Sequence, residues 1–154
     1  MTRPAQSEVQ KIYRVLSWIG IIDQLVVTRA TRALADIGLP FPQFRLLSHF
    51  ARRPNEPKTV GKVAAAMQQP QPGTTKTLQK MIGAGLLRVV PSKQDARSKP
   101  LFITAKGIRM LDRALETLTP VFRDAFAGWS EAELAVFLAQ LDRLKVWMDT
   151  RGRE

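Results

Sequence analysis

Apolar residues recur three or four positions apart along residues 8–37, and this spacing predicts one long helix. Its apolar positions are Ile12, Leu16, Ile19, Ile22, Val26 and Ala33. No proline interrupts the run. The stretch "GLPFP" (38–42) ends it, because glycine suits the position after a helix and proline cannot continue the pattern.

Two shorter helices follow. The first carries Phe44, Leu47 and Phe50 on one side and stops at "RRPNEP" (52–57). The second lies in "TVGKVAAAMQQ" (59–69), where Thr59 is the predicted N-cap. The apolar positions of this third helix are Val60, Val63, Ala64 and Met67.

The stretch "PQPGTTKTLQKMIGAG" (70–85) predicts a fourth helix, with its prolines confined to the start, where they are tolerated. At about 100° per residue, one side collects Thr74, Leu78, Met81 and Ile82, and the opposite side collects Gly73, Lys76 and Lys80. Gly85 ends this helix. "LLRVV" (86–90) and "LFIT" (101–104) then predict two strands joined by the polar loop "PSKQDARSKP".

The C-terminal part predicts two more helices. The first runs from Ala105 to about Ala127 with Leu111, Leu115, Leu118 and Phe122 on one side, and Pro120 predicts a kink or an interruption in it. The second begins with a capping box, Ser130 and Glu133. Its apolar positions are Leu134, Phe137, Leu138, Leu141, Leu144 and Met148. The predicted fold class is mainly α with a small β-hairpin.

Positive charge is concentrated in the middle of the chain. The 154 residues have a formal net charge of +11, and residues 58–106 hold nine Lys or Arg and a single acid, Asp95. The segments before and after are more balanced. A concentrated basic block favours one face that binds a polyanion. The alternative is a solvated charged face with no partner.

Composition excludes several classes of protein. The chain has no cysteine and one histidine, and it has no glycine-rich phosphate loop, so we expect neither an enzyme nor a metal or cofactor site. The most apolar run, "VLSWIGIIDQLVV" (15–27), is broken by Asp23 and too short for a membrane span. The N-terminus lacks the apolar core of a signal peptide. We expect a soluble cytoplasmic protein.

Two short helices joined by a tight turn and followed by a β-ribbon describe a winged helix-turn-helix. A helix with a small, polar front can enter the major groove of DNA, which is about 12 Å wide. A ribbon tip that bears Lys and Arg can reach the neighbouring minor groove, where the potential is negative. The charge on the hairpin tip is therefore expected to lie against phosphate.

At this point the sequence resembles the MarR family of bacterial transcriptional regulators. "GLL" (85–87), "DAR" (95–97) and "ITAKG" (103–107) match the end of the family's recognition helix, its D-x-R wing and its L-T-x-K-G, and "GLPFPQFRLLSHF" (38–50) is similar to its second helix. The resemblance implies one domain over 1–154, with a winged helix-turn-helix DNA-binding lobe at 40–104 and dimerisation helices at 8–37 and 105–150. It also implies a homodimer on a pseudo-palindromic operator. The alternative is that the terminal apolar faces pack within one chain.

The resemblance also assigns site residues. The front of the recognition helix would be Gln71, Gly73, Thr74, Thr75, Lys76 and Lys80, with Thr74 expected to pack more than to read bases. The wing would use Arg97 in the minor groove and Lys93, Ser98 and Lys99 on phosphates. Asp95 would orient Arg97 through a salt bridge. "QQPQPG" departs from the family's usual helix start.

A small phenolic or lipophilic effector is a further implication, since the family has a crevice between its dimer and DNA-binding parts. Trp18 and His49 are the candidates to line it. Tyr13, Trp129 and Trp147, like Trp18, are otherwise expected in the core or the dimer interface. The predicted function is a sequence-specific regulator of double-stranded DNA, expected to repress. The alternatives are a non-specific architectural DNA binder and a winged helix that binds protein or RNA.

Overall fold

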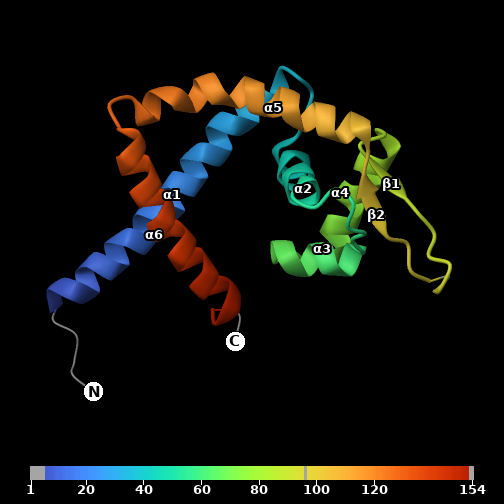
Figure 1. Cartoon of the computed structure of the whole chain (residues 1–154), viewed down its shortest axis with the longest axis horizontal. Coiled ribbons are helices and arrows are strands. Elements are labelled where there is room, and N and C mark those ends of the chain that lie inside the picture. Colours follow the sequence, from blue (N-terminus) through green and yellow to red (C-terminus); the bar gives the residue numbers. More distant parts are fainter. Residues whose placement is uncertain (1–5, 96, 153–154) are drawn as a thin grey trace. The chain divides into compact units, whose positions relative to one another are not determined.

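The computed structural model describes residues 6–95 and 97–152, and its elements follow the predicted order (Figure 1). They are α1 (Gln6–Ala35), α2 (Phe41–Ala51), α3 (Val60–Met67), α4 (Gln71–Gly83), β1 (Leu87–Val89), β2 (Leu101–Ile103), α5 (Ala105–Arg123), the 3-10 turn η1 (Asp124–Phe126) and α6 (Glu131–Thr150). The fold class is therefore confirmed: helices with one small antiparallel hairpin. The chain divides into two compact units, Met1–Val121 and Phe122–Glu154, and each is described by itself.

The core of the first unit combines apolar positions that the helical spacing identifies in α2 to α4 with the end of α1 and the strands, whereas most of the predicted apolar positions of α1 are exposed. It brings together the C-terminal end of α1, helices α2 to α4, both strands and one side of α5. Its largest fully buried side chains are Leu34, Leu47, Phe50, Val63, Leu78, Met81, Leu87 and Leu101. Burial of such side chains is the main stabilising contribution to a small lobe.

The hairpin is short and is extended by one residue from outside it. Leu87 pairs with Ile103 and Arg88 with Phe102 in the antiparallel register. On the other edge of β2, Lys58 and Leu101 exchange two backbone hydrogen bonds, of 3.1 and 2.9 Å. Lys58 is buried as a result, and its Nζ donates to the carbonyl oxygen of His49 at 3.1 Å. The segment before α3 thus ties the wing to α2.

The junction between α4, β2 and α5 explains the "GLL" and "ITAKG" motifs. Gly85 has a positive φ of 75°, which glycine adopts without strain. The Thr104 hydroxyl donates to the Gly85 carbonyl at 2.6 Å and accepts from the Gly107 N–H at 3.0 Å, so it also caps α5. The Lys106 Nζ donates to the Ala84 carbonyl at 2.7 Å, at the C-terminus of α4. A Cβ on Gly107 would overlap the carbonyl oxygen of Leu86.

Helix α5 does not stop at Pro120 but continues to Arg123 before η1 begins. The predicted interruption there is wrong. Pro120 is exposed and lies in the last turn, where the missing N–H costs a single backbone bond. The buried line of α5 runs through Gly107, Leu111, Ala114 and Leu118, and Leu115, on the same apolar side, is exposed.

Candidate nucleic-acid interface

Helices α3 and α4 form a helix-turn-helix whose turn is set by local chemistry. The Thr59 hydroxyl caps α3 by accepting from the Lys62 N–H at 3.3 Å, as predicted. Helix α3 ends at Gln68, which adopts the left-handed conformation with φ 50°. Pro70 then precedes α4, and Pro72 lies in its first turn, where no N–H is needed.

The front and back of α4 are distinct. Leu78 and Met81 are buried on the back, and Gln71, Gly73, Lys76 and Lys80 are exposed. Thr75 lies between them and is half-buried. Thr74 is not on the front, because it is only 3% exposed and its hydroxyl donates to the Pro70 carbonyl at 3.2 Å. Its inclusion among the front residues is corrected, in agreement with the expectation that it packs.

Two further residues of α4 lie on the exposed side. Pro72 and Gln79 are both exposed, and at about 100° per residue they fall within one turn of Lys76. The residue-by-residue resemblance did not select them. The helical spacing alone would have done so, since Gln79 is adjacent to Lys80 and opposite the buried side.

The wing tip is ordered by side chains that bond to its backbone. The Ser92 hydroxyl accepts from the N–H groups of Gln94 and Asp95, each at 3.3 Å. The Asp95 carboxylate accepts from the Arg97 backbone N–H at 2.9 Å. The predicted salt bridge from Asp95 to the Arg97 side chain is not among the ion pairs of the described residues. Asp95 therefore orients Arg97 through the turn, because a carboxylate two residues upstream reaches the N–H first.

The wing cations point away from the core. Lys93, Arg97 and Lys99 are exposed, and Ser98 is half-buried with its N–H donating to the Asp95 carbonyl at 3.0 Å. Ala96 of the "DAR" motif lies outside the described residues. The structure thus holds three cations on one turned loop.

Sequence reasoning missed an arginine at the base of the wing. Arg88 and Phe102 form a cross-strand pair on the solvent face of the hairpin, and the guanidinium carbon lies 4.9 Å from the ring centroid. Stacking of this kind restricts the side chain while leaving its donors available. The alternation of "LLRVV" was the available signal, because it places Arg88 opposite the buried Leu87 side.

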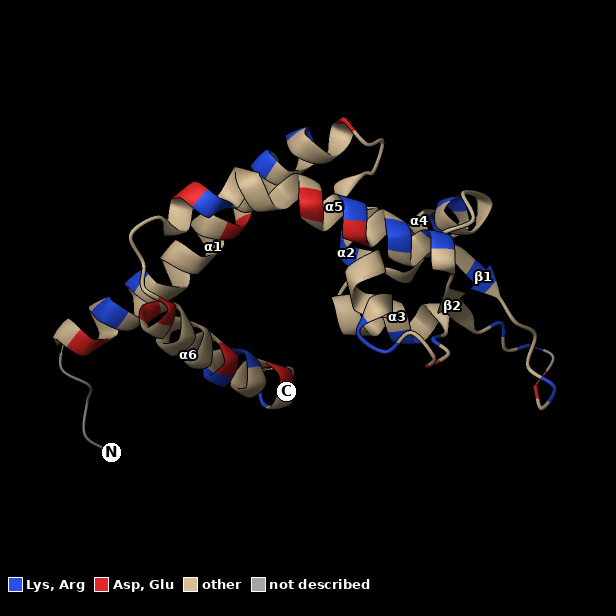
Figure 2. Cartoon of the chain, turned by 45° about the horizontal axis from the view of Figure 1, so that its top comes forward, with Lys and Arg blue, Asp and Glu red and all other residues tan. Residues whose placement is uncertain are grey.

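Not every cation of the basic block faces outward. Lys58 is buried against the Phe50 ring, with its Nζ 5.3 Å from the centroid; Lys106 is exposed, but its Nζ is bonded to the end of α4. Burial lowers the pKa of Lys58. The remaining cations of residues 58–106 are exposed: Lys62, Lys76, Lys80, Arg88, Lys93, Arg97 and Lys99. Figure 2 shows α3, α4 and β1 with basic segments and no acidic ones.

The two candidate effector residues lie in different settings. Trp18 is exposed on α1 and lines a hollow of about 530 Å³ with Gln10, Tyr13, Arg14 and Ser17. His49 is not in that lining; it is half-buried on α2, with its ring edge-on to Phe50. Burial, followed by the charges of Lys58 and Arg52, lowers the pKa of His49. The hollow therefore combines two aromatic rings with a cation, without the histidine.

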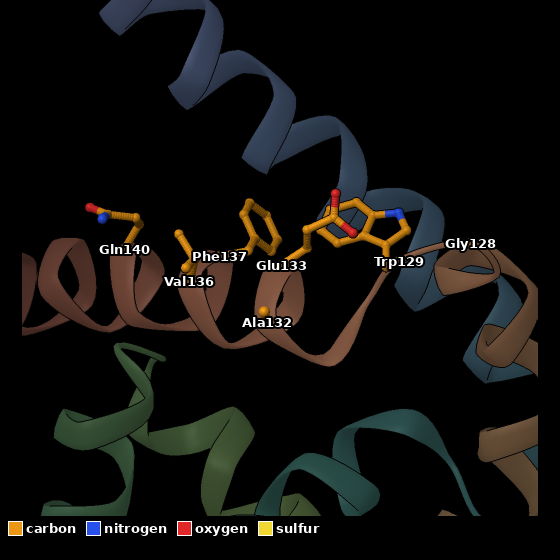
Figure 3. Close-up of a pocket in the computed structure, with 7 residues that line it drawn as sticks. All are labelled: Gly128, Trp129, Ala132, Glu133, Val136, Phe137 and Gln140. Atoms are coloured by element: carbon orange, nitrogen blue, oxygen red, sulfur yellow. The ribbon is translucent and has the colours of Figure 1, made fainter.

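The four large aromatic residues, expected in the core or the dimer interface, do not lie in the core of the chain. Trp18, Trp129 and Trp147 are exposed, and Tyr13 is 74% exposed. In the second unit, Trp129 packs edge-on against Phe126 and Phe137, with each pair of centroids 5.5 Å apart. Figure 3 shows Trp129, Glu133 and Phe137 projecting from the same side of this segment, around a hollow of about 630 Å³. Tyr13 and Trp18 lie on α1 and Trp147 lies on α6, and one chain leaves the apolar sides of both helices open.

Across the described residues, none of the helices has the combination of length and apolar character that a membrane span requires.

Comparison with known proteins supports the winged-helix assignment. The model of the MarR family matches residues 37–98. The HTH-type transcriptional repressor IacR of Pseudomonas putida is 24% identical over 131 residues, which cover 85% of this chain and 77% of that protein.

Solved structures share the fold over most of the chain. A MarR family protein from Bacillus stearothermophilus has a TM-score of 0.76 at 20% identity, covering 96% of this chain and 100% of that one. A mutant MarR from E. coli complexed with operator DNA has a TM-score of 0.70 at 14% identity, covering 87% and 95%. Residues 37–98 thus match the MarR family, and the chain shares the winged-helix fold of MarR-family structures over most of its length.

Proposed function

We propose that the protein is a transcriptional repressor that binds a specific DNA operator as a homodimer. One observation carries the proposal: the exposed front of α4 is cationic and free of acids, and it adjoins a wing whose tip holds Lys93, Arg97 and Lys99 outward. The apolar back of α4 is buried in the core, so the lobe presents this helix rigidly.

The geometry of the lobe suits a duplex. In a helix-turn-helix, the N-terminal residues of the second helix contact base edges in the major groove. Here these residues are Gln71, Pro72, Gly73 and Thr75, and a Cβ at Gly73 would meet nothing within 4 Å. The wing then reaches the neighbouring minor groove, which attracts a guanidinium such as that of Arg97.

Homodimer formation is supported by apolar surface that one chain does not cover. Along α1 only Ala30 and Leu34 are buried, whereas ten large apolar side chains between Val9 and Leu25 are exposed. Helix α6 has no buried residue. Apolar patches of this extent mark interfaces. A second copy that covers them would place two winged helix-turn-helix lobes on a two-fold symmetric site.

Effector control is the finer part of the proposal. The α1 hollow offers the rings of Tyr13 and Trp18 beside the Arg14 guanidinium, a combination that suits a small aromatic or lipophilic acid. Binding there would release DNA if it favours a dimer geometry that the operator does not accept. Repression itself is supported by the relative named as a repressor.

Selection of bound duplexes from a random pool tests the proposal. We expect a consensus with two-fold symmetry and a preference over random duplex of roughly 10³-fold or more. Sedimentation of the complex should give two chains per duplex. A pool that shows no enrichment would instead identify a non-specific architectural binder, and an absence of any duplex binding would reject the DNA function altogether.

A further inference from the structure

The threonines of α4 use their hydroxyl groups within the helix. The Thr75 Oγ1 donates to the Gln71 carbonyl at 2.8 Å, and the Thr77 Oγ1 donates to the Gly73 carbonyl at 3.2 Å. Thr74 makes the same bond on the buried side. A threonine hydroxyl has one hydrogen to donate, so these bonds commit the donors of Thr75 and Thr77 to the backbone of α4.

The methyl group of each threonine, beside a hydroxyl oxygen that can only accept, is then left for an outside contact. A β-branched side chain has few staggered arrangements in a helix, and the one that places Oγ1 against the carbonyl four residues back fixes the methyl as well. Thr75 and Thr77 are both half-buried, and about 100° of rotation separates each from the exposed Lys76 between them. The cation thus has an apolar methyl group on either side.

The neighbouring residues offer little other hydrogen bonding. Pro72 has no N–H, Gly73 has no side chain, and Lys76 donates but cannot accept. The exposed Gln71 and Gln79 carry amides that can pair a donor with an acceptor, but few groups between them on α4 can distinguish bases in this way. Among the four bases only thymine presents an apolar group, its 5-methyl, in the major groove.

We propose that α4 reads thymine through methyl–methyl contacts made by Thr75 and Thr77, with Lys76 between them on guanine or phosphate. The proposal rests on the DNA-binding function proposed above, and it names the chemical feature of the operator that gives specificity. The half-site should contain thymines whose 5-methyl groups, rather than their hydrogen-bonding atoms, carry recognition.

The DNA side is tested by replacing each thymine of the selected half-site with 2′-deoxyuridine, which removes only the 5-methyl group. Fluorescence anisotropy would measure affinity for each duplex. We expect about fourfold weaker binding at the one or two contacted positions, the loss that one buried methyl group accounts for, and no change elsewhere. Uniform affinity across all positions would overturn the proposal.

The protein side is tested by two substitutions that separate methyl from hydroxyl. Thr75→Val keeps the methyl and loses the hydroxyl, so it should retain both the affinity and the thymine preference. Thr75→Ser keeps the hydroxyl and loses the methyl, so the thymine and deoxyuridine duplexes should bind equally well. The same pair at Thr77 tests the second contact. Retention by Ser and loss by Val would show readout through the hydroxyl and would overturn the proposal.

Matched controls make the outcomes distinct. Thr119 on α5 makes the same bond, to the Leu115 carbonyl at 2.7 Å, so Thr119→Val and Thr119→Ser report any general effect on helices. Circular dichroism melting checks the fold of each variant. If the inference alone fails, the wild-type protein still selects an operator, and deoxyuridine changes nothing. If the DNA function fails, no duplex is selected at all.

Discussion

Helices α4 and α1 differ in the burial of their apolar residues. In α4, Leu78 and Met81 are buried by the rest of its own chain, and the exposed side is polar and cationic. In the longer α1, the apolar stripe is exposed over most of its length, and burial begins only at Ala30. Periodicity thus identifies an apolar face but not the chain that covers it. The lobe around α4 has a core of its own, whereas the apolar side of α1 is left exposed by its own chain and is covered only in the proposed dimer.

The largest effect is expected from a charge in the α1 stripe. Ile19 lies at the centre of that stripe, so in a dimer Ile19→Arg would bury an unpaired charge twice, at about 3–5 kcal/mol each. We expect a monomer by analytical ultracentrifugation at micromolar concentration. Gln24→Arg, on the opposite side of α1, is the matched control and should remain dimeric. If Ile19→Arg remained dimeric, that face of α1 would not lie in the dimer interface.

Truncation in the lobe should act on folding instead. Leu47 is 0% exposed, and Leu47→Ala should lower the free energy of unfolding by about 2–5 kcal/mol in urea titrations. Its counterpart Leu25→Ala removes the same atoms from a side chain 59% exposed on α1. The effect of Leu25→Ala should grow as the protein is concentrated and the dimer forms. If both variants lost the same free energy of unfolding at every protein concentration, Leu25 would be packed within its own chain as Leu47 is.

At the wing tip, Arg97→Ala should weaken operator binding by about 1–3 kcal/mol and leave the fold and the oligomeric state unchanged. Arg109→Ala, which removes an exposed arginine on α5, serves as the control. Fluorescence anisotropy titrations at fixed salt measure the operator affinity of each variant. Unchanged affinity in Arg97→Ala would remove the wing from the binding surface.

On α4, Lys80→Ala should lower the affinity for all duplexes alike if the ammonium contacts phosphate. The slope of log K against log salt should then fall by about 0.9, the value for one neutralised phosphate. Titrations of operator and random duplex at several salt concentrations measure it. A loss confined to the operator would show that Lys80 reads a base.

The smallest effect concerns pH and the lobe interior. Because burial and nearby cations lower the pKa of His49, the folded state binds fewer protons there than the unfolded chain. Stability from this group is complete above about pH 6.5 and is lost as pH falls below it. Wild type should therefore melt at a lower temperature at pH 5.5 than at pH 7.5, and His49→Gln should reduce that difference. An unaltered difference would assign it to other groups.

The sequence predicted every helix and both strands because their apolar spacings, caps and breakers are local signals. Thr59, Gly85 and the Ser130 capping box are examples that the structure confirms. Local patterns do not reveal contacts between residues that are distant in sequence, and they do not show which of two nearby partners a side chain will bond. Lys58 belongs by sequence to the basic block, but its pairing with Leu101 buries it. Asp95 reached a nearer partner than the one predicted.

The joint made by Gly85, Thr104, Lys106 and Gly107 has a mechanical consequence. It connects the C-terminal end of α4, the base of the wing and the start of α5 through short hydrogen bonds and the close approach of Gly107 to the backbone of Leu86. In the proposed complex, a tilt of α5 would therefore move α4 and the wing together. None of the surface positions of α4 takes part in that joint. If the proposed function holds, a library varied only at Gln71, Thr75, Lys76 and Gln79 should yield proteins with new operators in which α4, the wing and α5 remain coupled.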